Sequence, residues 1–138
     1  MFVLVVPLFL PVPYLLTPSE HALGTPDYMP PEQAMGKTAE IDQRSDIFSL
    51  GATLYYCLAG RSPFQGKELY ETLSNVINND PPLPSTIISL KTKSKLDRAV
   101  IPKDLETICL KCLEKDKAKR YQTAQELVQD LRHYLAGK

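Results

Sequence analysis

Residues 45–59 read SDIFSLGATLYYCLA, and this stretch decides the fold. Ser45 or Asp46 can cap the start of a helix here, and Gly60 can end it in the left-handed conformation. Apolar side chains surround most of the helix instead of following one narrow stripe. A helix that is apolar on most sides is buried on most sides, so the sequence predicts a central helix.

Three further helices are predicted around it, over residues 67–78, 103–115 and 123–135. On the first of these, the side chains expected to face inward are Leu69, Leu73, Val76 and Ile77. Thr123 and Glu126 give a T-x-x-E capping box before the last helix. Residues 24–36 and 80–102, rich in proline, are expected to form loops. Because no segment alternates as a strand does, the sequence predicts an all-α fold with four main helices and proline-rich loops.

The composition fits one globular domain without a strong charge. The chain has 138 residues, of which 43% are hydrophobic and 23% charged. It carries 16 Lys and Arg against 16 Asp and Glu, so its formal net charge is zero. A neutral chain lacks the basic surface of a general nucleic-acid binder, and no nucleic-acid partner is expected.

The N-terminal end differs in character from the rest. Residues 1–16 hold no charged side chain, but the run is short for a membrane helix and Pro7, Pro11 and Pro13 interrupt it. We predict an apolar head over residues 1–21, outside the domain at 22–138. Contact of residues 1–16 with a membrane is disfavoured but left open.

The spacing and positions of the three cysteines favour a role in core packing over a metal site. Cys109 and Cys112 have a C-x-x-C spacing, but zinc would need two more ligands, and Cys57 and the two histidines are scattered. Both thiols fall on the apolar face of the helix at 103–115, where cysteine acts as a small hydrophobic residue. We therefore expect reduced thiols, no metal site and a cytoplasmic chain, with membrane anchoring of a parent kinase left open.

Four blocks of sequence carry a more specific signal. They are GTPDYMPPEQ at 24–33, SDIFSLG at 45–51, LAGRSPF at 58–64 and KDKAKRY at 115–121. In order and spacing they resemble the lower part of the C-lobe of a eukaryotic-type serine/threonine protein kinase domain. Residues 104–115 and 130–137 are similar to bacterial members, especially those of planctomycete type. The resemblance covers about residues 22–138.

The resemblance implies a segment that binds the protein substrate. Its residues are Gly24, Thr25, Pro26 and Tyr28. Thr25 would help orient the hydroxyl that accepts the phosphate. Thr17 and Ser19 lie where activation-loop phosphorylation sites occur in the family, which makes them candidate phosphosites.

Two structural roles also follow from the resemblance. Glu32, in a Pro-Pro-Glu version of the family's A-P-E block, would pair with Arg120, and such a pair is bidentate. Asp46 would accept hydrogen bonds from a catalytic loop, although capping of its own helix is the alternative reading.

The groups that perform phosphoryl transfer are missing. The sequence holds no G-x-G-x-x-G loop, no phosphate-binding strand lysine, no H-R-D and no D-F-G. No catalytic or metal-binding residue is therefore assigned, and ATP and Mg²⁺ would belong to an intact parent kinase. We predict that the chain alone neither binds ATP nor transfers phosphate.

Three hypotheses of function follow, in this order. The chain is the remnant of a truncated kinase; or it is a non-catalytic module that binds a protein substrate or a partner kinase lobe; or it is one half of a split kinase. In each case the central helix would lack the segments that cover it in a whole kinase, which favours a marginally stable fold and an exposed apolar face.

Overall fold

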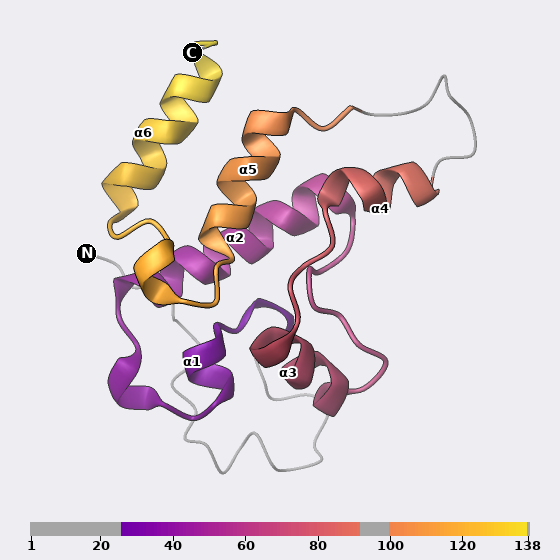
Figure 1. Cartoon of the computed structure of the whole chain (residues 1–138), viewed down its shortest axis with the longest axis vertical. Helices are drawn as coiled ribbons and strands as arrows, with labels where there is room; N and C mark the ends of the chain where they lie inside the picture. The colour runs from indigo at the N-terminus through magenta and orange to yellow at the C-terminus, as the bar shows by residue number, and fades with distance from the viewer. Residues whose placement is uncertain (1–25, 92–99, 138) are drawn as a thin grey trace.

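The structure is a computed structural model that describes residues 26–91 and 100–137 (Figure 1). In chain order its elements are η2 (Pro26–Tyr28), α1 (Pro31–Ala34), η3 (Thr38–Glu40), α2 (Gln43–Ala59), α3 (Leu69–Asn78), α4 (Pro84–Lys91), α5 (Lys103–Cys112), η4 (Lys117–Lys119) and α6 (Ala124–Leu135). Over these two ranges the chain forms helices and no strands, which confirms the all-α prediction. α2 contacts α5, α4 and η2, whereas α6 packs on α5 and α1 on α3.

α2 begins two residues earlier than predicted, because a different residue caps it. The Asp42 carboxylate accepts the backbone N–H of Arg44 at 2.8 Å, and the Asp42 N–H donates to Ser45 Oγ at 3.2 Å. The expectation that Ser45 or Asp46 caps the helix is therefore wrong, and Asp46 lies inside the first turn. Gly60 ends the helix at φ 72°, in the left-handed conformation predicted for it.

α2 is buried along one face and open along another. Phe48, Ala52, Tyr55 and Ala59 are fully buried, which is the pattern of one helix face. The opposite side carries a second run at helical spacing, which we call the exposed stripe; it consists of Leu50, Thr53 and Cys57. Leu50 in this stripe is 47% exposed, and Thr53 and Cys57 are exposed as well. The helix is central, as predicted, but it is not buried on most sides.

The contact between α2 and α5 is close because a glycine faces a cysteine. A Cβ added at Gly51 would lie only 2.4 Å from Cys112 Cβ. Cys109 and Cys112 are both buried, and the Cys109 thiol donates to the Gly51 carbonyl at 3.4 Å. Burial raises the pKa of each thiol to about 12, so both remain protonated core groups. In the part of the chain that the structure describes, no cluster of His, Cys, Asp and Glu is arranged to hold a metal.

Two buried clusters share α2 and α5. The larger contains Phe48, Ala52, Tyr55, Ala59, Phe64, Val76, Ile87, Cys109 and Leu113. The smaller contains Ile47, Ile108, Cys112, Tyr121 and Leu127. The rings of Phe48 and Phe64 stack with their centroids 5.9 Å apart, so the segment after α2 is part of the core.

The segments expected to be loops hold short helices. Residues 80–102 contain α4, which begins at Pro84 and buries Ile87 in the larger cluster. Proline is well tolerated in the first turn of a helix, so the run of prolines that suggested a loop marks a helix start instead. Likewise, residues 24–36 include η2 and α1.

The predicted inward face of α3 needs one correction. Leu69 is 39% exposed, and Thr72 is buried in its place. The Thr72 hydroxyl accepts the backbone N–H of Gly66 at 2.9 Å, which satisfies a polar group at a buried position. Val76 is fully buried, as expected.

The ends of α5 and α6 differ slightly from the prediction. α5 ends at Cys112, three residues before the expected end. Thr123 caps α6 through the Glu126 N–H at 3.2 Å, but the Glu126 carboxylate accepts from Gln122 N at 2.8 Å and so reaches one residue beyond the cap. No helix within residues 26–91 and 100–137 is both long and apolar enough to cross a membrane.

Candidate substrate-docking segment

A buried ion pair fixes the chain directly after η2. Pro31 is the first residue of α1, a position that favours proline, so Glu32 falls in the first turn. Arg120 Nη1 lies 2.8 Å from Glu32 Oε1, and Arg120 Nη2 lies 3.0 Å from Glu32 Oε2. The Arg120 side chain is 0% exposed and that of Glu32 is 4% exposed. The resemblance placed these two residues together, and the structure shows a bidentate pair.

The guanidinium of Arg120 is satisfied at every N–H. Besides the carboxylate, it donates to three backbone carbonyls: Nε to Glu114 at 2.6 Å, Nη1 to Arg44 at 3.0 Å and Nη2 to Lys115 at 3.2 Å. Arginine has five N–H donors, and each has an acceptor here. The guanidinium also lies 4.9 Å from the ring centroid of Phe48. One side chain thus joins α1, the start of α2 and the segment after α5.

The carboxylate of Glu32 remains charged despite its burial. Burial alone would raise its pKa, but the hydrogen bonds and charge of Arg120, with the Ser45 hydroxyl at 2.7 Å, hold the pKa below its ordinary value. Removing one partner of such a pair leaves an uncompensated buried charge, a loss of about 3–5 kcal/mol.

η2 itself is held at its C-terminal side. The Ser49 hydroxyl of α2 donates to the Tyr28 carbonyl at 2.8 Å, and Met29 N donates to the Pro26 carbonyl at 3.2 Å. Met29 is 2% exposed, whereas Pro26 and Tyr28 are half-buried. The predicted substrate residues Pro26 and Tyr28 therefore lie on a turn whose next residue is anchored in the core.

The acidic and phenolic groups of η2 are partly withdrawn from water. Burial raises the pKa of Asp27, and a hydrogen bond with Ser62 offsets part of that rise. The pKa of Tyr28 is also raised, first by burial and then by the neighbouring Asp27, Tyr56 and Cys57. η2 thus lies against the C-terminal end of α2 and the segment that follows it.

Several predicted site residues lie outside the described residues. They are Thr17, Ser19, Gly24 and Thr25, together with the apolar head at 1–21. Asp46 is described; it is half-buried in the first turn of α2.

Sequence reasoning missed the polar residues that support the segment. Ser45 binds Glu32 and Ser49 binds the Tyr28 carbonyl, whereas the sequence suggested only a helix cap for Ser45 and a helix position for Ser49. Their spacing of four residues puts both hydroxyl groups on one side of α2, and this spacing is the sequence feature that could have indicated a shared role. Lys115 was also missed: its Nζ donates to the Val76 carbonyl at 2.6 Å and lies 4.2 Å from the Phe64 ring centroid. No local pattern indicates that contact.

A comparison with protein families finds a match over most of the chain. The family described as "Protein kinase domain" matches residues 15–131. This match starts inside the apolar head, and the domain boundary at residue 22 stays a prediction.

Bacterial kinases are similar over most of the chain. A probable serine/threonine-protein kinase PknB of Bifidobacterium longum is 34% identical over 122 residues, which cover 88% of this chain and 16% of that protein. The serine/threonine-protein kinase PknD of Protochlamydia amoebophila is 34% identical over 123 residues, covering 89% of this chain and 12% of that protein. PknB of Mycobacterium tuberculosis is 35% identical over 116 residues, which cover 84% of this chain and 17% of that protein.

A solved structure shares the arrangement of the helices. The twitchin kinase region from C. elegans superposes with a TM-score of 0.60 at 30% identity, and the match covers 78% of this chain and 16% of that one. The chain spans 12–17% of the length of the bacterial relatives named above. Together with the buried pair and the helical architecture, these matches show that the chain belongs to the protein kinase domain family and corresponds to part of a serine/threonine kinase C-lobe.

Proposed function

We propose that this chain provides the substrate-facing part of a serine/threonine protein kinase domain and does not transfer phosphate by itself. The observation that carries the proposal is the Glu32–Arg120 pair. It is buried and bidentate, and it fastens the chain four residues after Tyr28. Such an anchor gives the preceding segment a fixed place relative to α2, which is what positioning of a protein substrate requires.

The residues present do not fit ATP and Mg²⁺. Phosphoryl transfer depends on metal ligands and a phosphate-binding lysine, and the motifs that supply them are absent from the sequence. The described residues hold no metal-binding cluster either. We therefore assign this chain the positioning of the acceptor protein and no chemical step. Its three free cysteines support a cytoplasmic location.

Two activity measurements test the proposal. The isolated chain should show no magnesium-dependent incorporation of phosphate from ATP. A graft in which residues 24–138 replace the corresponding part of the B. longum relative should phosphorylate a serine- or threonine-containing peptide. Activity of the isolated chain, or an inactive but folded graft, would refute the proposal.

A hydroxyl-specific pair of variants tests the role of Thr25 in the graft. Thr25→Ala should lower kcat by about tenfold or more, because a positioned hydrogen bond to the acceptor is lost. Thr25→Ser keeps the hydroxyl and should retain most of the activity. Equal activity of the two variants would show that the hydroxyl has no role.

The exposed stripe supports the second candidate function, binding to a separate kinase lobe. Leu50 lies 47% exposed in the middle of α2, where an apolar side chain is available to a protein partner. The upstream part of the B. longum relative, made as a separate chain, should then co-purify with this protein. Leu50→Glu should abolish the complex, whereas Val128→Glu on α6, where Val128 is 41% exposed, should not. Complex formation unaffected by Leu50→Glu would exclude the stripe.

A further inference from the structure

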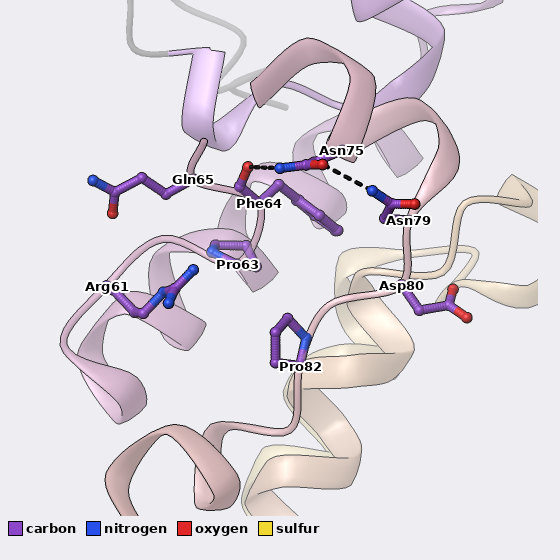
Figure 2. A pocket seen from close by; sticks show the side chains of 8 residues that line it. All are labelled: Arg61, Pro63, Phe64, Gln65, Asn75, Asn79, Asp80 and Pro82. Atoms are coloured by element: carbon purple, nitrogen blue, oxygen red, sulfur yellow. Dashed lines mark hydrogen bonds between the residues drawn. The ribbon is translucent and has the colours of Figure 1, made fainter. Parts of the chain in front are cut away.

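A small pocket lies between the segment after α2 and the end of α3 (Figure 2). Its volume is about 200 Å³. Arg61 lies at one side, Asn79 and Asp80 lie at the other, and Pro63 and Pro82 lie between them. None of these residues belongs to the docking segment or to the ion pair described above.

Hydrogen bonds hold the walls of this pocket in place. The Tyr55 hydroxyl donates to the Pro82 carbonyl at 2.7 Å, and Asn75 Nδ2 donates to the Phe64 carbonyl at 3.1 Å. Lys115 Nζ donates to the Val76 carbonyl and so fixes the end of α3. A pocket with fixed walls loses little conformational entropy on binding a ligand.

The two asparagines fix the polarity of one wall. A backbone carbonyl only accepts, so the Asn75 group that faces Phe64 must be the amide nitrogen. Asn75 Oδ1 then accepts from Asn79 Nδ2 at 2.8 Å, and the Asn79 oxygen is turned away from that bond (Figure 2). In the same view the Asp80 carboxylate points away from Arg61, so this wall places no negative charge directly opposite the guanidinium.

The opposite wall presents a cation without an anion. Arg61 Nε is shielded from solvent and has no hydrogen-bond acceptor among the described residues. The described part of the chain also gives Arg61 no ion-pair partner within 4.0 Å, whereas every N–H of Arg120 is satisfied. A shielded donor without an acceptor is costly and is the group that a ligand can satisfy.

We propose that this pocket binds the carboxylate side chain of a peptide segment from a partner protein, with Arg61 as the donor. Arginine matches a carboxylate in a bidentate geometry. The volume is below the range of about 300–1,000 Å³ that accommodates drug-sized ligands, so one side chain fits better than a nucleotide. The site is independent of the function proposed above, because it uses neither the docking segment nor the exposed stripe.

Asp80 determines which acidic peptides bind. Its carboxylate is exposed and points away from Arg61 (Figure 2), so it lies at the outer edge of the pocket, where it repels a further negative charge on the ligand and attracts a positive one. A basic residue beside the acidic one would be attracted to Asp80. The pocket therefore selects an acidic side chain that is flanked by lysine or arginine.

NMR titration of the full chain tests this site. The probes are two pools of acetylated and amidated hexapeptides that differ only in a fixed central Glu-Lys or Gln-Lys pair. The Glu pool should shift the Nε–H resonance of Arg61, and the Gln pool should not. Arg61→Gln should weaken binding of the Glu pool by about tenfold or more, since a charged hydrogen bond is lost.

Two further variants keep the result interpretable. Arg132→Gln, an exposed arginine on α6, is the matched control and should bind as the unsubstituted chain does. A third hexapeptide pool carries a central Glu-Ala pair in place of Glu-Lys. Asp80→Asn should strengthen binding of this Glu-Ala pool, because the repelling charge is removed. The proposal is overturned if neither the Glu-Lys nor the Gln-Lys pool shifts the resonance, or if both bind equally. If Arg61→Gln does not fold, Asp80→Asn decides instead: the proposal is overturned if this variant does not bind the Glu-Ala pool more strongly.

Discussion

The two faces of α2 differ in how far this chain completes them. Phe48, Ala52 and Tyr55 are covered by α5, α4 and the segment after α2, and Arg120 lies over the Phe48 ring. On the exposed stripe at the other side, Leu50 is 47% exposed and Thr53 and Cys57 are exposed as well. Within residues 26–91 and 100–137, the side chains of α2 are therefore packed into a core on one side only. This open side is the surface that the proposed binding to a separate kinase lobe would use.

The largest change in stability is expected when the charge of Glu32 is removed from the buried ion pair. Glu32→Gln should lower the free energy of unfolding by about 3–5 kcal/mol, because Arg120 would be left as an uncompensated buried cation. Urea unfolding followed by circular dichroism measures this difference. Glu68→Gln, at an exposed glutamate whose side chain makes no cap bond, is the control. A loss below about 1 kcal/mol would mean that the pair behaves as a surface pair.

A smaller effect is expected where α2 meets α5. Gly51→Ala puts a methyl group 2.4 Å from Cys112 Cβ, so the helices must separate, at a cost of about 1–3 kcal/mol. Cys112→Ala keeps the Cβ and should not rescue the variant. Full stability of Gly51→Ala in thermal unfolding would show that the two helices are less tightly packed than described.

Acidification should remove part of the stabilisation by the ion pair. The folded-state pKa of Glu32 lies below its ordinary value of 4.5, so the unfolded chain binds more protons as the pH falls below that value. Stability from this group is therefore present above pH 4.5 and decreases below it. Comparison of unfolding free energies at pH 6 and pH 3.5 should show a smaller decrease in Glu32→Gln than in the unsubstituted chain. Equal decreases would assign acid sensitivity to other carboxylates.

The smallest effect is expected on the exposed stripe. Leu50→Ala should change the free energy of unfolding by no more than about 0.5 kcal/mol, whereas Phe48→Ala should cost about 3–5 kcal/mol. The two residues are neighbours in opposite environments, so the pair of variants measures the contrast between the faces directly. A large loss for Leu50→Ala would mean that the isolated chain covers the stripe in solution.

The sequence predicted the main helices because each carries a local signal. Gly60 and Thr123 end or begin helices through their own conformation and hydrogen bonds, and both were identified correctly. α4 was missed because its prolines are equally typical of loops. The cap of α2 was misplaced by a few residues, since Asp42 and Asp46 are both good caps and only tertiary contacts select one.

In the candidate site, too, some contacts could be predicted from the sequence and others could not. Blocks of sequence were sufficient to pair Glu32 with Arg120, because a family resemblance links residues that are far apart in the chain. The hydroxyl groups of Ser45 and Ser49, and the Lys115 contact with α3, could not be read in this way. Each depends on which backbone carbonyl or carboxylate the folded chain brings to that position.

By itself, the sequence determined the family, the helical class and the absence of the motifs for phosphoryl transfer. These properties are carried by local patterns and by the order of residues along the chain. Only the tertiary structure decided which face of α2 is closed, that all donors of Arg120 are satisfied, and that Arg61 Nε is shielded with no acceptor among the residues that the structure describes. Burial and hydrogen-bond satisfaction depend on contacts between segments that are distant in sequence, and no local pattern contains them.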